Sequence, residues 1–141
     1  MLFRSVSTSM LPQFLSKGTV LFTEIDGNPF AFVDRYRMEQ VIVNLLNNAL
    51  KYGPGKPVHL SLTRRNSMVE LKVRDRGVGI SPEHITKIFG KFERGGKVSS
   101  VAGLGLGLYI TREIVQAFKG TIEVASVEGE WTEFTVLLPG A

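Results

Sequence analysis

Residues 38–52 read MEQVIVNLLNNALKY and place apolar side chains at the spacing of a single helix face. The positions on that face are Met38, Val41, Ile42, Leu45, Leu46, Ala49 and Leu50. Asn44, Asn48 and Lys51 form a second line beside them. Asparagine is unfavourable inside a helix, so the pair indicates either a solvated flank or a polar rim that faces a ligand. We therefore predict a core helix over residues 38–52, capped by Asp34, whose rim offers amide oxygens to a cation and an ammonium to phosphate.

The composition indicates one globular domain. The chain has 141 residues, of which 43% are hydrophobic and 21% are charged, and no apolar run is long enough to span a bilayer. The net charge of +4 comes from scattered lysines and arginines, which indicates a bias toward phosphate rather than an extended nucleic-acid surface. The absence of cysteine excludes disulfides, thiolate metal sites and cysteine nucleophiles.

The first 23 residues contain no acidic residue and are rich in serine. They lack the apolar core of a signal peptide, and we expect Pro12 to interrupt any long helix. A transit peptide is one reading of this composition. We favour a second, in which residues 1–16 are a leading segment or the remnant of an upstream region and residues 17–141 form the domain.

Several stretches have the composition of β-strands. Residues 19–25 and 30–33 flank turn residues and predict a small hairpin at the entrance to the domain. Four further stretches alternate apolar and polar residues and predict two antiparallel pairs: 58–63 with 69–74, and 121–126 with 132–138. Each of these strands would be apolar on one face.

Asp75 continues the inward-facing series of Val69, Leu71 and Val73. Desolvating an unpaired carboxylate costs several kcal/mol, so we expect either a buried donor or a ligand opposite it. The loop that follows it, residues 76–80, carries two glycines that let the backbone approach something closely.

A short helix is predicted from Ser81-Pro82 to Phe89, followed by a loop over residues 90–103 with the composition of a mobile lid. The glycines in 103–108 precede another predicted helix and form either an anion cradle or a packing loop. Walker and dinucleotide-binding patterns fail, and so does the nucleophile elbow of a hydrolase. His59 and His84 are interpreted as surface residues, too few for a metal cluster.

Four blocks stand in order: NLLNNALKY (44–52), DRGVGI (75–80), KIFGKFERG (87–95) and GLGLGL (103–108). Together they resemble the N, G1, F and G2 boxes of the ATP-binding catalytic domain of sensor histidine kinases, a group that also includes gyrase, the Hsp90 chaperones and mismatch-repair ATPases. The resemblance extends over residues 17–139. It implies the Bergerat fold, a two-layer α/β sandwich in which a mixed, mostly antiparallel sheet packs on helices on one face, with a mobile ATP lid.

The resemblance implies ATP and Mg²⁺ as ligands. Asn48 matches the Mg²⁺ ligand, and Asn44 and Lys51 match the catalytic residues beside the triphosphate. Asp75 matches the reader of the adenine amine. The other nucleotide-binding positions that it implies are Tyr52, Gly77, Gly79, Ile80, Phe92, Arg94, Gly103, Leu104, Gly105, Leu106, Gly107, Leu108 and Thr132.

Two departures from the family pattern stand out. Trp131 occupies a position where the final element usually has glycine, which puts the support of Asp75 by Thr132 in doubt. Neither histidine lies in the setting of a phosphoacceptor, so the resemblance implies a catalytic fragment or a kinase acting in trans. The implied partners are a histidine-bearing dimerisation domain and, indirectly, a response regulator. Neither nucleic-acid binding nor direct membrane contact is implied, and the expected location is cytoplasmic.

ATP-hydrolysing relatives carry a glutamate four residues before the Mg²⁺ asparagine, as the general base for water. Asn44 stands at that position, and an amide cannot take a proton at neutral pH. The sequence therefore favours phosphoryl transfer to a histidine over hydrolysis. Two alternatives stay open: a serine kinase of the anti-sigma type, and a nucleotide-binding regulatory module that transfers nothing.

Overall fold

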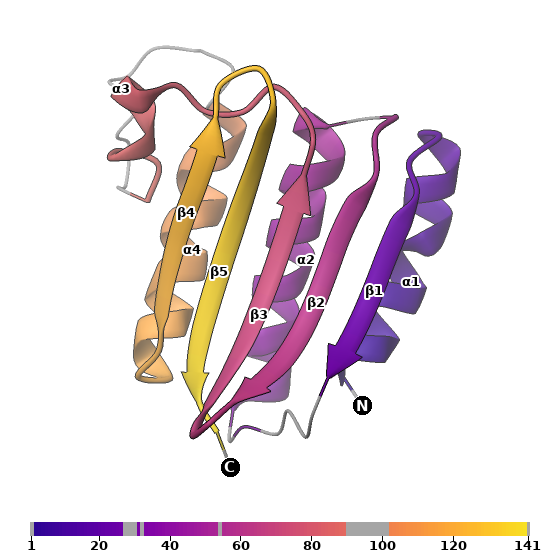
Figure 1. The fold of residues 1–141 in the computed structure, drawn as a ribbon. Helices are drawn as coiled ribbons and strands as arrows, with labels where there is room; N and C mark the ends of the chain where they lie inside the picture. The colour runs from indigo at the N-terminus through magenta and orange to yellow at the C-terminus, as the bar shows by residue number, and fades with distance from the viewer. Residues whose placement is uncertain (1, 27–30, 32, 54, 90–101, 141) are drawn as a thin grey trace.

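The computed structural model describes residues 2–26, 31, 33–53, 55–89 and 102–140, with backbone only for 2–4 and 102–106. Figure 1 shows a five-stranded sheet with α1, α2 and α4 on one face, so the predicted two-layer sandwich is confirmed. The elements are α1 Leu2–Ser16, β1 Leu21–Asp26, α2 Arg35–Tyr52, β2 Val58–Arg65, β3 Met68–Asp75, α3 Pro82–Ile85, α4 Ala102–Ala117, β4 Thr121–Val127 and β5 Trp131–Pro139.

The strand order is β1-β2-β3-β5-β4, with β1 parallel to β2 and every other pair antiparallel. The sheet is therefore mixed and mostly antiparallel, and both predicted antiparallel pairs are confirmed. The predicted entrance hairpin is wrong, because β1 pairs with β2. Ala31 and Val33 lie outside any strand, and the rest of 27–32 lies outside the described residues. The physical reason is that α2 packs on the sheet as the crossover of a β-α-β unit, which makes its two strands parallel.

The predicted core helix is confirmed as α2. All seven apolar positions of its predicted face are buried. Asp34 caps its start, accepting hydrogen bonds at Oδ1 from the backbone N–H of Tyr36 at 2.9 Å and of Arg37 at 3.1 Å. Gly53 ends the helix, and its N–H donates to the carbonyl of Ala49. The apolar residues of β2, β3 and β5 pack against this helix from the sheet side.

Helix α1 runs through Pro12, so the expected interruption there is wrong. Proline removes one helical hydrogen bond, but Val6, Met10 and Phe14 recur every four residues and are buried in the same core cluster as α2. Burial of this stripe offsets the lost bond. The division of the chain at residue 17 stays a prediction, although α1 shares one core with the rest.

Two other segments differ from expectation. Helix α3 is only four residues long, and Ser81 is its N-cap residue, as predicted, but makes no side-chain capping bond, since its Oγ lies 2.6 Å from His84 Nδ1. Helix α4 begins at Ala102, so the glycines of 103–107 lie inside its first turns rather than before it. Leu108, Thr111 and Val115 continue one buried helical stripe. The predicted lid lies outside the described residues except for its last two positions.

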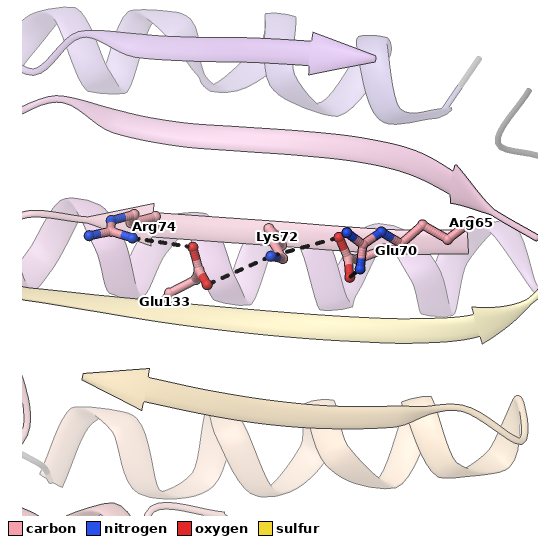
Figure 2. Close-up of polar contacts among 5 residues, drawn as sticks. All are labelled: Arg65, Glu70, Lys72, Arg74 and Glu133. Carbon is pink, nitrogen blue, oxygen red and sulfur yellow. Dashed lines mark hydrogen bonds and ion pairs between the residues drawn. The ribbon is translucent and has the colours of Figure 1, made fainter. Parts of the chain in front are cut away.

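The outer face of the sheet carries a row of charged side chains (Figure 2). Its members are Arg65, Glu70, Lys72, Arg74 and Glu133, joined by four ion pairs. This face is polar, as the alternation of the strands predicted. Within the described part of the chain, no helix is long and apolar enough to cross a membrane.

Candidate functional site

The elements that carry most of the described candidate site residues meet at one edge of the sheet. In Figure 1 the C-terminal end of α2, the arrowhead of β3, the start of α4 and the turn from β4 to β5 all lie at the upper edge. The loop 76–80 joins two of these, because the N–H of Val78 donates to the carbonyl of Tyr52 at 3.1 Å. Residues from the first and second sequence blocks are therefore in contact.

Asp75 lies at the end of β3 and is only 6% exposed, so the inward orientation predicted from strand parity is confirmed. Its Oδ1 accepts a hydrogen bond from the N–H of Gly77 at 2.8 Å. Burial raises the pKa of Asp75 to about 6, against a smaller opposing effect of that hydrogen bond. Thr132 stands directly across from it in the register of β3 and β5 and is also buried. A carboxylate in this position is costly to ionise unless a ligand donates to it.

Asn48 and Tyr52 lie one helical turn apart near the C-terminal end of α2 and carry polar atoms that lack partners among the described residues. Among the described residues, Asn48 Nδ2 and the Tyr52 hydroxyl are buried without a hydrogen bond. An orphaned polar group of this kind costs about 1–3 kcal/mol, which a polar ligand would recover. Lys51 is exposed, with its Nζ 5.4 Å from the centre of the Tyr52 ring. These groups fit a ligand that offers both hydrogen-bonding atoms and negative charge.

Asn44 makes a contact that the sequence did not indicate. Its Nδ2 donates to Thr111 Oγ1 at 3.2 Å, and Thr111 donates to the carbonyl of Gly107 at 2.8 Å. Thr111 is fully buried. The polar rim of α2 is thus tied to the glycine-containing turns of α4. The available signal was a threonine on the apolar stripe of α4, which sequence reasoning did not use.

The glycines after Asp75 are required by backbone packing. A Cβ on Gly77 would lie 2.1 Å from the carbonyl oxygen of Tyr52, and a Cβ on Gly79 would lie 2.4 Å from that of Val127. Gly79 also has φ +69°, a left-handed conformation that favours glycine. The predicted close approach therefore exists, and it brings the loop against α2 on one side and the β4–β5 turn on the other.

The remaining predicted positions divide into three groups. Ile80 and Leu108 have buried side chains that belong to the hydrophobic core. The backbone of 103–107 forms the start of α4, where the first N–H groups of a helix have no partner within it. Phe92 and Arg94 lie outside the described residues. The structure thus brings together Tyr52, Asp75, Gly77 and Thr132, and Asn48 lies one helical turn before Tyr52.

A family model described as Histidine kinase-, DNA gyrase B-, and HSP90-like ATPase matches residues 33–141. The chain belongs to this family. The match includes the whole of α2, the loop after β3 and the final hairpin, so every site residue described above lies within the HATPase domain.

Curated relatives of the HATPase domain are sensor kinases. The adaptive-response sensory kinase SasA of Synechococcus elongatus is 36% identical over 141 residues, 98% of this chain and 36% of the relative. The sensor-like histidine kinase SenX3 of Mycobacterium tuberculosis is 38% identical over 120 residues, 83% of this chain and 29% of the relative. The chain spans about a third of the length of these proteins.

Solved structures agree with this assignment. The catalytic domain of histidine kinase ThkA superposes with a TM-score of 0.84 at 26% identity, covering 98% of this chain and 90% of that one. Full-length ShkA in complex with AMPPNP gives 0.86 at 28% identity, covering 99% of this chain and 29% of ShkA. The chain is a catalytic ATPase domain of the sensor histidine kinase type, and this family implies ATP binding.

Proposed function

We propose that this HATPase domain binds Mg-ATP at the upper edge of the sheet and delivers the γ-phosphoryl group to a histidine on a separate dimerisation domain. The observation that supports it best is the buried carboxylate of Asp75 beside the C-terminal end of α2, a helix that also carries the unpartnered polar atoms of Asn48 and Tyr52. A purine with an exocyclic amine offers Asp75 a donor, and the charge-assisted hydrogen bond would offset the cost of ionising the buried carboxyl.

The donor set fits the triphosphate and its metal. The amide of Asn48 offers an oxygen for Mg²⁺, Lys51 offers an exposed ammonium, and the first turn of α4 offers free backbone N–H groups. When bound, the metal supplies neutralisation of phosphate charge. The role of the chain itself would be to hold and orient the nucleotide, which is most of what phosphoryl transfer requires.

Asn44 favours transfer over hydrolysis. Its amide cannot accept a proton at neutral pH, and in this structure it donates to Thr111. Water would therefore lack a general base at this position, whereas a histidine imidazole is nucleophilic without one. Since transfer draws on ATP, the proposal places the domain in the cytoplasm, in contact with a histidine-bearing domain and with a response regulator only indirectly.

Incubation of the purified chain with γ-labelled ATP and Mg²⁺, with and without a histidine-bearing dimerisation domain, tests the proposal. We expect acid-labile label on the added domain, none on this chain, and slow phosphate release. The controls are an acceptor whose histidine is replaced by glutamine and this chain with Asp75→Asn. Acid-stable label would indicate a serine kinase, absence of label would indicate a regulatory module, and rapid phosphate release would indicate an ATPase.

A further inference from the structure

The turn between β4 and β5 holds the loop that follows Asp75. The N–H of Gly129 donates to the carbonyl of Val78 at 2.7 Å, and the N–H of Ile80 donates to Ser126 Oγ at 2.8 Å. Gly79 lies between them, and the carbonyl oxygen of Val127 occupies the space that a Cβ on Gly79 would need. The loop 76–80 is therefore fixed at its far end by a segment nearly fifty residues further along the chain.

Ser126 is the side chain at the centre of this contact. Besides accepting from Ile80, its Oγ lies 2.7 Å from the carbonyl oxygen of Trp131 and 3.0 Å from Thr132 Oγ1. A carbonyl can only accept, so the single proton of Ser126 goes to Trp131. The hydroxyl of Thr132 must then be the donor in its contact with Ser126. All the hydrogen-bonding capacity of Ser126 is used, and the proton of Thr132 points toward it.

These contacts lead to Asp75 by two routes. The loop 76–80 supplies the Gly77 N–H that binds Asp75 Oδ1 at 2.8 Å. Thr132 lies across from Asp75 in the register of the two strands. Ser126 is hydrogen-bonded to Ile80 of the loop and to Thr132. It therefore contacts both segments that flank the Asp75 carboxylate.

We propose that Ser126 is a positioning residue for base recognition: by holding the loop 76–80 and Thr132 together it sets the orientation in which Asp75 accepts the adenine amine. This inference rests on the proposed nucleotide function. A serine that only filled space in the hairpin would affect stability alone, whereas a positioning serine affects the choice of base. Guanine presents a carbonyl oxygen where adenine presents its amine, so the ratio of ATP to GTP affinity measures the orientation of Asp75.

Calorimetric titration with Mg-ATP, Mg-GTP and Mg-tripolyphosphate tests it on three variants. Ser126→Ala removes the hydroxyl, Ser126→Thr keeps it, and Ser61→Ala is a matched control, a half-buried strand serine on the outer face of the sheet. We expect Ser126→Ala to weaken ATP by about three- to ten-fold, to lower the preference for ATP over GTP, and to leave tripolyphosphate unchanged. Ser126→Thr and Ser61→Ala should retain the affinities of the parent chain.

An unchanged ATP-to-GTP preference in Ser126→Ala would overturn the inference, and so would an equal loss of affinity for ATP and tripolyphosphate. Should Ser126→Ala melt below the assay temperature, Ser126→Cys replaces it with the same two outcomes. If the parent chain itself shows no preference for ATP, the proposed function fails and this inference fails with it. If the parent chain prefers ATP and the Ser126→Ala variant prefers it equally, only this inference fails and the proposed function stands.

Discussion

At the scale of single residues, ionised Asp75 lowers the free energy of unfolding of the domain, because its carboxylate is buried. Burial raises its pKa from 3.8 to about 6. The folded state therefore binds the proton more tightly than the unfolded chain does. The corresponding stability is fully present below pH 3.8, declines as the pH rises through about 6, and is absent above it. At neutral pH the free domain holds a charge that it would be more stable without.

Asp75→Asn should separate stability from binding. The neutral amide can still accept from the Gly77 N–H, so we expect the free energy of unfolding at pH 8 to rise by about 2–3 kcal/mol, with little change at pH 4. ATP should bind about ten- to a hundred-fold more weakly, because a charge-assisted hydrogen bond is lost. Denaturant unfolding at the two pH values and calorimetry with ATP measure both effects. Unchanged ATP affinity would remove Asp75 from the site.

At the scale of secondary-structure elements, α1 depends on packing to run through Pro12. Phe14 is fully buried in the common core, whereas Leu15, its neighbour in the chain, is 73% exposed. We expect Phe14→Ala to lower the free energy of unfolding by about 3–5 kcal/mol and Leu15→Ala to change it by less than about 0.5 kcal/mol.

Urea unfolding monitored by circular dichroism compares the two α1 variants. A single transition shifted to lower urea in Phe14→Ala would place α1 in the cooperative unit with α2. Equal midpoints for the two variants would instead support the predicted boundary at residue 17, with 1–16 as a leading segment outside that unit.

Helix α4 offers a second test at the same scale. A Cβ on Gly107 would meet no described atom within 4 Å, and glycine costs roughly 0.5–1 kcal/mol relative to alanine inside a helix. Gly107→Ala should therefore raise the thermal midpoint of the free domain. If the glycine serves the close approach of phosphate, the same change should weaken Mg-ATP. A variant that is both more stable and equally tight for Mg-ATP would show that the position is dispensable for binding.

At the scale of the whole molecule, the two faces of the sheet are stabilised differently. The helix side is apolar, while the outer side carries the row of ion pairs in Figure 2. Glu133 is shared by Lys72 at 3.9 Å and Arg74 at 3.7 Å, and Arg74 also lies 4.3 Å from the centre of the Trp131 ring. Trp131 stands where the family usually has glycine. Its ring therefore packs on the outer face of the sheet, whereas the neighbouring Thr132 and its strand partner Asp75 are buried.

Glu133→Gln should cost little, because half-exposed ion pairs contribute about 0–1 kcal/mol. We expect a loss of stability within that range at 50 mM NaCl that largely disappears at 1 M, where screening acts within a few ångströms. Chemical denaturation with urea, which adds no ionic strength, measures it. A loss that persists in high salt would show that Glu133 acts through packing rather than through its charge.

The sequence by itself determined the core helix, the two antiparallel strand pairs and the direction of the Asp75 side chain. The period of residues 38–52 identified the core face of α2, strand alternation identified the two antiparallel pairs, and parity turned Asp75 inward. These patterns follow from the short periods of the helix and the strand, which repeat about every 3.6 and every 2 residues. All the residues that reveal such a period lie close together in the chain. The order of four motifs then indicated the family.

Tertiary structure alone decided which distant groups meet. Ser126 bonds to a residue 46 positions away, and Asn44 bonds to Thr111, 67 positions away. The parallel pairing of β1 with β2 and the course of α1 through Pro12 were likewise decided by burial against the common core. A local pattern indicates which face of an element is apolar. The element against which that face packs depends on the packing of the whole chain, because tertiary context overrides local propensity.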